Sequence, residues 1–144
     1  MGEGDCGNCN GCDCGSGLRH EIIEYGRRLE RAWSRETAAP SCQDRWTREN
    51  NALGQGAVTA LLIQDKFGGD LIRTEVAGHG SHYFNRLPNG WTVDFTIQQF
   101  PDGAQQAPEE VRTRGYVLDS PGAVAARTRE RYELLKAALE KIPE

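Results

Sequence analysis

Long apolar runs are missing from this sequence of 144 residues. A membrane-spanning helix needs about 20 consecutive apolar residues. The longest apolar stretch here, residues 60–63 with Ala57 and Val58 just before it, is far shorter. The first 17 residues also lack the basic segment and the apolar segment of a secretory signal peptide. We therefore expect neither a transmembrane nor a secreted protein, and the chain length suits one domain.

Lysine is scarce, and basic charge does not dominate. Of the 17 basic residues only Lys66, Lys136 and Lys141 are lysines, and the 21 acidic residues give a formal net charge of −4. Arginines gather at 27–35 and at 127–131, but each group is interspersed with glutamates on a predicted helix. Such a pattern indicates a solvated, ion-paired helix face. We expect no nucleic-acid partner and no membrane partner.

Cysteine is concentrated at one end of the chain. Cys42 stands alone, and the other four of the five cysteines have the spacing C-x2-C-x2-C-x-C, at Cys6, Cys9, Cys12 and Cys14. An odd number of cysteines without a signal peptide predicts a reduced, cytoplasmic protein rather than a disulfide framework. Four nearby thiolates can bind Zn²⁺ or another thiophilic metal. The alternative is that residues 1–17 form a flexible, glycine-rich tail with no packing role.

The spacing of apolar residues predicts the remaining elements. An apolar residue recurs every three or four positions in the helical stretches, and alternation marks the strands. Residues 54–67 could form a buried strand or a buried helix, and their length favours a helix. The first half of the chain is expected to contain a helix at 18–33, a long loop at 34–53 and a helix ending at Gly68-Gly69. A strand at 70–76 and a hairpin of 81–87 and 91–96 follow. The stretch at 105–119 is ambiguous, with a short helix opening at Pro108, and the last element is a helix from about Ser120 to Lys141.

These elements predict one α+β domain over residues 18–144, with helices packed on a small antiparallel sheet. Within the hairpin, His82 lies on one strand and Asp94 on the next. In thiol-enzyme sites an acid orients the imidazole, and the imidazole takes a proton from a nucleophile at a helix N-terminus. The alternative is a hydrogen-bonded pair with a purely structural role.

The length of the hairpin loop decides whether this pair can form. With a two-residue loop, His82 and Asp94 would face opposite sides of the sheet. With a three-residue loop, Pro88-Asn89-Gly90, residue 84 opposes residue 94, and the two side chains become diagonal neighbours on one face. We therefore predict an odd-length loop, or a bulge that restores the common face.

Several segments resemble the YunG-like family over most of residues 30–137. They are WSRET at 33–37, GQGAVTALLIQD at 54–65 with Gly68-Gly69, GSHYFNRL at 80–87, DFT at 94–96 and TRERYELLK at 128–136. The resemblance implies a small papain- or transglutaminase-like core with a Cys–His–Asp arrangement. It also implies that His82 is the base and Asp94 the residue that orients it.

The sequence departs from the family pattern at one position. The residue after Gln55 is expected to be the nucleophilic cysteine, and here it is Gly56, which has no side chain to attack with. Gln55, Trp46 and Trp91 remain candidates for binding a substrate, although both tryptophans could equally be core or rim residues.

Three hypotheses follow from these residues. The first is a YunG-like relative of thiol hydrolases or acyltransferases that has lost its nucleophile and binds a peptide- or amide-like ligand, with no cofactor required by the core. The second is a metal-binding or redox-responsive module in which the N-terminal cysteines are the working residues. The third is an active enzyme with another nucleophile.

Overall fold

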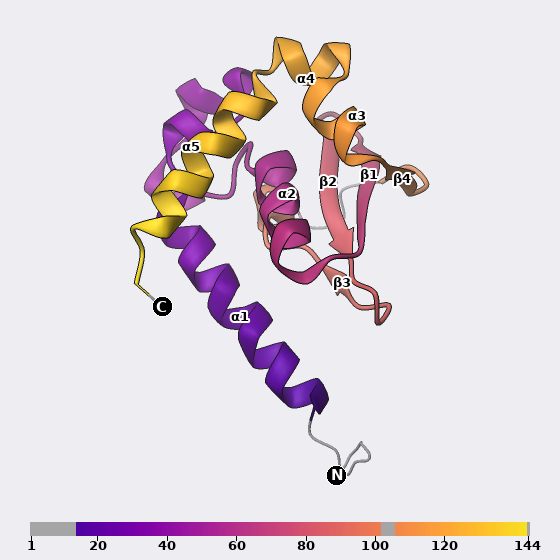
Figure 1. Cartoon of the computed structure of the whole chain (residues 1–144). Helices are drawn as coiled ribbons and strands as arrows, with labels where there is room; N and C mark the ends of the chain where they lie inside the picture. The colour runs from indigo at the N-terminus through magenta and orange to yellow at the C-terminus, as the bar shows by residue number, and fades with distance from the viewer. Residues whose placement is uncertain (1–13, 102–105, 144) are drawn as a thin grey trace.

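The computed structural model describes residues 14–101 and 106–143, and the side chains of residues 17–101 and 106–143. Its elements alternate between helices and a small sheet in the way that an α+β domain requires (Figure 1). The central helix, α2, spans Gly56–Phe67, and its residues 58–63 are all buried. This helix is apolar on every side because it packs on the sheet with one face and on other helices with the opposite face.

The sheet has four antiparallel strands in the order β3-β2-β1-β4. The strands β1 (Asp70–Val76) and β2 (Gly80–Arg86), which were both predicted, form its centre, and β3 is only Thr92–Val93. The outer strand β4 (Glu110–Arg112) was not predicted. The prediction of a short helix that begins at Pro108 is wrong, because residues 107–109 are not helical and lead into β4. Val111 in this strand is 65% exposed, so the segment shows no apolar alternation by which a strand is recognised.

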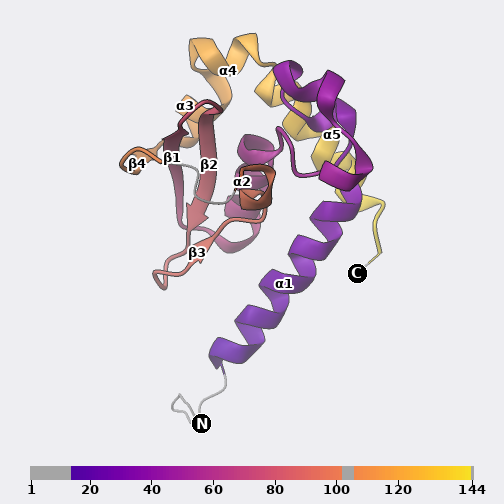
Figure 2. The same ribbon diagram turned by 180° about the vertical axis from the view of Figure 1, so that it is seen from behind.

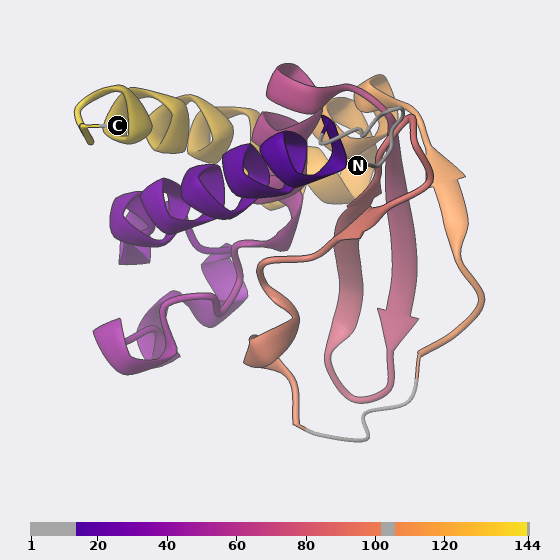
Figure 3. The same ribbon diagram turned by 90° about the horizontal axis from the view of Figure 1, so that it is seen from below.

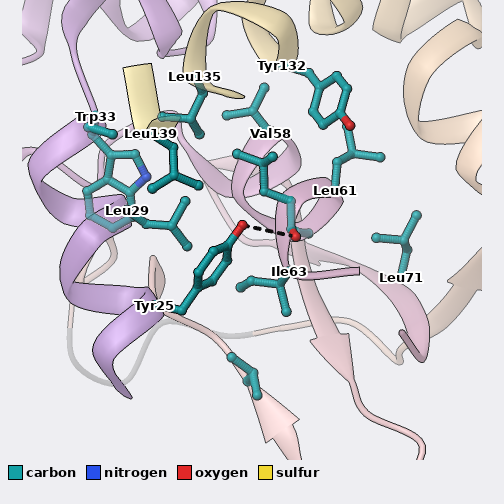
Figure 4. Close-up of a cluster of buried hydrophobic side chains, with 14 of the residues drawn as sticks. Tyr25, Leu29, Trp33, Val58, Leu61, Ile63, Leu71, Tyr132, Leu135 and Leu139 are labelled. Atoms are coloured by element: carbon teal, nitrogen blue, oxygen red, sulfur yellow. Dashed lines mark hydrogen bonds between the residues drawn. The ribbon is translucent and has the colours of Figure 1, made fainter. Parts of the chain in front are cut away.

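The first helix, α1 (Cys14–Ala32), begins four residues before the predicted start. Its apolar face packs with α2 and with α5 (Thr128–Glu140), and α1 and α5 lie side by side (Figure 3). Figure 4 shows Tyr25, Leu29 and Trp33 of this region pointing into the core. The Tyr25 hydroxyl donates to the backbone oxygen of Leu62 at 3.4 Å, and the Trp33 indole Nε1 donates to Thr59 Oγ1 at 2.9 Å.

The C-terminal region is broken where one helix was predicted. After α3 (Arg114–Asp119), α4 (Pro121–Ala125) is separated from α5 by Arg127, whose φ of 55° lies in the left-handed region. A left-handed residue cannot continue a right-handed helix, so the two helices run in different directions (Figure 2). The break has no glycine or proline to mark it. Val124, which one continuous helix with this apolar spacing would place on its buried face, is 64% exposed.

The predicted loop from 34 to 53 contains three short 3₁₀ helices: η1 (Arg35–Thr37), η2 (Pro40–Arg45) and η3 (Arg48–Asn50). A fourth, η4 (Ile97–Gln99), follows β3. The predicted α+β class, with helices on a small antiparallel sheet, is confirmed. In the described residues, no helix has the length and the apolar content that crossing a bilayer demands.

Candidate functional site

The register of the hairpin brings His82 and Asp94 to one face. Asn85 pairs with Val93 and Arg86 with Thr92. The backbone N–H of Leu87 then donates to the oxygen of Trp91 at 2.8 Å, which leaves a three-residue loop at 88–90. The predicted odd-length loop is therefore confirmed.

His82 and Asp94 form a direct pair. His82 Nε2 lies 2.7 Å from Asp94 Oδ2, and the imidazole is 2% exposed. Oδ1 of Asp94 accepts a hydrogen bond from the backbone N–H of Thr96 at 3.3 Å. The Phe100 ring stands edge-on to the imidazole with 4.9 Å between centroids, and the Phe84 ring is stacked at 5.8 Å. The carboxylate and the two aromatic rings together fix the orientation of the imidazole.

The second nitrogen of this imidazole faces the start of α2. His82 Nδ1 is buried and has no hydrogen-bond partner among the described residues. Gly56, the first residue of α2, lies so close that a β-carbon placed on it would be 3.3 Å from Nδ1. If Nε2 carries the proton that Asp94 accepts, Nδ1 is left with a free lone pair. The imidazole can therefore take a proton from a group attached at position 56.

A cavity of about 470 Å³ opens next to this pair. Segments far apart in the chain line it, so that Cys42, Gly56, His82 and Arg131 share one space. Cys42 is free and half-buried in η2. No sequence pattern places Cys42 here, because eleven residues without periodicity separate it from Gly54. Gly54 is nevertheless adjacent: a β-carbon on it would lie 3.0 Å from the β-carbon of Cys42.

Gln55 does not line this cavity, although the residues on both sides of it do. It is fully buried, and its amide Oε1 accepts from the Thr37 hydroxyl at 2.8 Å. Its Nε2 donates to the backbone oxygen of Ser34 at 2.9 Å. These bonds tie the N-terminus of α2 to η1, so the geometry gives Gln55 a positioning role, and its predicted contact with a substrate stays a prediction.

The two candidate tryptophans also lie outside this cavity. Trp46 is buried, donates from Nε1 to the backbone oxygen of Asn51 at 3.0 Å, and carries the Arg48 guanidinium over its ring. Trp91 borders a separate hollow of about 340 Å³ between α1 and β3, where the guanidinium of Arg19 lies over its ring. Neither ring is in the part of the molecule where His82 and Gly56 meet.

The predicted metal site lies beyond what the structure describes. Cys6, Cys9 and Cys12 fall outside the described residues, and Cys14 is the first residue of α1 with its side chain not described. Within 14–101 and 106–143, no group of three or more potential metal-binding side chains is present. Metal binding by the N-terminal cysteines therefore stays a prediction.

Arg131 is a site residue that sequence analysis missed. It projects from α5 into the cavity wall and is 3% exposed. Burial and the neighbouring charge of Arg127 lower its pKa to about 10. The guanidinium is therefore still a cation at neutral pH. The sequence offered no signal for this role, because Arg131 stands in an Arg- and Glu-rich run that is typical of a solvated helix.

The fold and the site together define a class of protein: an α+β domain in which a buried histidine–carboxylate pair faces the N-terminus of the central helix. The YunG protein family model matches residues 21–143, so the chain belongs to the YunG family. The chain is 42% identical over 82 residues to "Uncharacterized protein YunG" of Bacillus subtilis (strain 168). This match covers 57% of the chain and 61% of the Bacillus protein. No solved structure matches the chain.

Proposed function

We propose that this chain is a relative of papain- and transglutaminase-like thiol hydrolases or acyltransferases that has kept the binding cavity and lost the nucleophile. Its ligand is peptide- or amide-like. The observation that supports the proposal most is the arrangement of His82. One ring nitrogen is paired with Asp94 at 2.7 Å, and the other is unpartnered and aimed at the position where a side chain of residue 56 would stand.

In a thiol enzyme these positions have defined roles. A cysteine at a helix N-terminus is deprotonated by an adjacent imidazole, and the helix dipole stabilises the thiolate. The carboxylate on the far side of the ring stabilises the imidazolium that results. In this proposal His82 corresponds to the base, Asp94 to the acid that orients it, and the first residue of α2 to the nucleophile. Gly56 supplies no thiol, and without a nucleophile only binding and weak residual catalysis remain.

The start of α2 is suited to bind a carbonyl oxygen. The first N–H groups of a helix have no partner within the helix, and the side chain of Gln55, the residue before α2, does not cap them. Gly56 and Ala57 both line the cavity. Backbone N–H groups at such a position hydrogen-bond a carbonyl oxygen of a bound amide, which is why an amide-like ligand is proposed.

The variant Gly56→Cys tests the proposal. Its thiol pKa should fall from the ordinary value of about 8.5 to below about 7.5, because the imidazolium and the helix N-terminus stabilise the thiolate. The measurement is the rate of alkylation by iodoacetamide between pH 5 and 9, the cysteines being resolved by peptide mass spectrometry so that Cys42 and the N-terminal thiols are followed separately.

Two controls separate the histidine from a general helix effect. Gly115→Cys places a thiol near the start of α3 and outside the cavity, where its β-carbon would make only an ordinary contact of 3.9 Å with Thr113 Oγ1, and its thiol should titrate normally. Adding Asp94→Asn to Gly56→Cys should move the low pKa upward, because the imidazolium loses its carboxylate. A thiol at position 56 that titrates like the one at 115 would refute the proposed acyl-transfer ancestry.

A further inference from the structure

The cavity wall contains arginine and histidine side chains in a protein that is acidic overall. Its lining includes Arg73, His79, His82 and Arg131, and no aspartate or glutamate among the described residues borders it. The whole chain carries a formal net charge of −4. A wall that has cationic side chains and, among its described residues, no carboxylate favours anionic molecules over neutral ones of the same shape.

The two arginines in this wall differ in how their charge is balanced. Arg73 forms ion pairs with Glu75 and Glu110 and also donates to the Ser81 hydroxyl at 2.7 Å. Arg131 forms no ion pair with any described residue. Its three bonds go to neutral acceptors, which are the backbone oxygen of Ala126 at 2.8 Å, the backbone oxygen of Thr37 at 3.1 Å and Thr128 Oγ1 at 3.3 Å.

Arg131 retains donors for a ligand. A guanidinium has five N–H groups, and the three bonds use one each on Nε, Nη1 and Nη2. One N–H on each terminal nitrogen is left, which is the fork that binds two oxygens of a carboxylate or phosphate. Buried charges are ordinarily paired, so a guanidinium that is buried in a cavity wall and has no ion-pair partner among the described residues points to an anion supplied by a bound ligand.

We propose that the cavity binds a small ligand through an anionic oxygen group, a carboxylate or a phosphate, held by Arg131. The remainder of the ligand extends toward Gly56 and His82. Taken with the proposed function, on which this part rests, the ligand is an amide that carries an acidic group. Hydrogen bonds connect Arg131 to the start of α2, which supports a single ligand that contacts both. Arg131 donates to the backbone oxygen of Thr37, and the Thr37 hydroxyl donates to Gln55, the residue before α2.

The test adds a competing charge without removing Arg131, whose bonds to Thr37 and Ala126 also support the fold. Gly122 lines the cavity, its φ is not left-handed, and a β-carbon on it would meet nothing within 4 Å. Gly122→Asp therefore places a carboxylate in the wall at little structural cost. Gly122→Asn is the neutral control of the same shape, and Gly115→Asp adds the same charge outside the cavity.

The probes are N-acetylglycine, its neutral analogue N-acetylglycinamide and inorganic phosphate, with binding measured by ligand-detected NMR on the full chain. N-acetylglycine or phosphate should bind at least about tenfold more tightly than N-acetylglycinamide. Gly122→Asp should weaken the charged probes at least about tenfold, because like charges in one cavity repel. Gly122→Asn and Gly115→Asp should leave the affinity unchanged. The ranking of N-acetylglycine against phosphate tells which anionic group the site prefers.

Equal binding of the charged and neutral probes would overturn the proposal. So would absence of binding by both anions at about 10 mM, or an affinity that Gly122→Asp leaves unchanged. These outcomes are independent of the thiol experiment. A lowered thiol pKa in Gly56→Cys without anion selectivity would support the proposed function and reject the anion site. An ordinary thiol pKa together with anion selectivity would reject the proposed function and support an anion site.

Discussion

Substituting alanine for Gly56 should change the stability far less than substituting alanine for Gly69, although one glycine begins α2 and the other follows it closely. The φ of Gly56 is not left-handed, and its β-carbon would lie 3.3 Å from His82 Nδ1 and 3.4 Å from the backbone oxygen of Tyr83. Gly69 has a φ of 85°, and its β-carbon would lie 2.3 Å from the backbone oxygen of Arg86. The first site has just enough room for a side chain, and the second has none.

The magnitudes follow from these contacts. In a helix, alanine is favoured over glycine by about 0.5–1 kcal/mol, and the tight contacts at Gly56 offset part of this gain. We expect Gly56→Ala to change the free energy of unfolding by less than about 1 kcal/mol. Gly69→Ala pays about 1–2 kcal/mol for a left-handed backbone and about 1–3 kcal/mol for overlap with the strand. It should lose about 2–5 kcal/mol.

Equilibrium unfolding in urea, compared at constant m value, measures both changes. A loss of more than about 2 kcal/mol in Gly56→Ala would show that position 56 cannot hold a side chain. The proposal of a vacated nucleophile position would then fail before any thiol is introduced.

Two further predictions concern the core and the helix break. Arg127→Asn should raise the free energy of unfolding by about 0.5–1 kcal/mol in the same urea assay, since asparagine tolerates the left-handed conformation and suits the start of α5. A loss of stability would mean that the contacts of the Arg127 side chain stabilise the fold by more than its left-handed backbone destabilises it. The second concerns alkaline pH. Burial raises the pKa of Tyr25 and of Tyr132 to about 12. The unfolded chain ionises these phenols near pH 10, so stability should be complete below pH 10 and fall as the pH rises to about 12. Tyr25→Phe should reduce this fall in urea unfolding measured from pH 9 to 12, and an unchanged slope would contradict the assignment.

The parts of the fold that were predicted correctly depend on local patterns. The strand at 70–76, the helix closed by Gly68-Gly69 and the three-residue hairpin loop are all set by neighbouring residues. Because side chains alternate along a strand, the loop length alone decided that His82 and Asp94 share a face. The central pair of the candidate site could therefore be predicted from a few residues.

The rest depends on contacts between distant segments. Arg131 looks like any arginine of a solvated helix until α5 packs beside η1 and buries it. Cys42 lies beside Gly54 only because the 3₁₀ helices fold the intervening chain back. The left-handed conformation of Arg127 is unfavourable for arginine on its own, so no local preference indicates it. Tertiary packing determined all three positions.

The cavity wall runs from Ala39, just before η2, to Arg131 in α5, so it is assembled only when almost the whole domain is folded. A molecule that occupies this cavity binds only the native state, because the unfolded chain has no such site. By mass action, such a molecule at a hundred times its dissociation constant adds about 2.7 kcal/mol to stability. The melting temperature of the protein is thus a direct gauge of occupancy, and a thermal-shift screen of metabolite collections can find the natural occupant without any assay of catalysis.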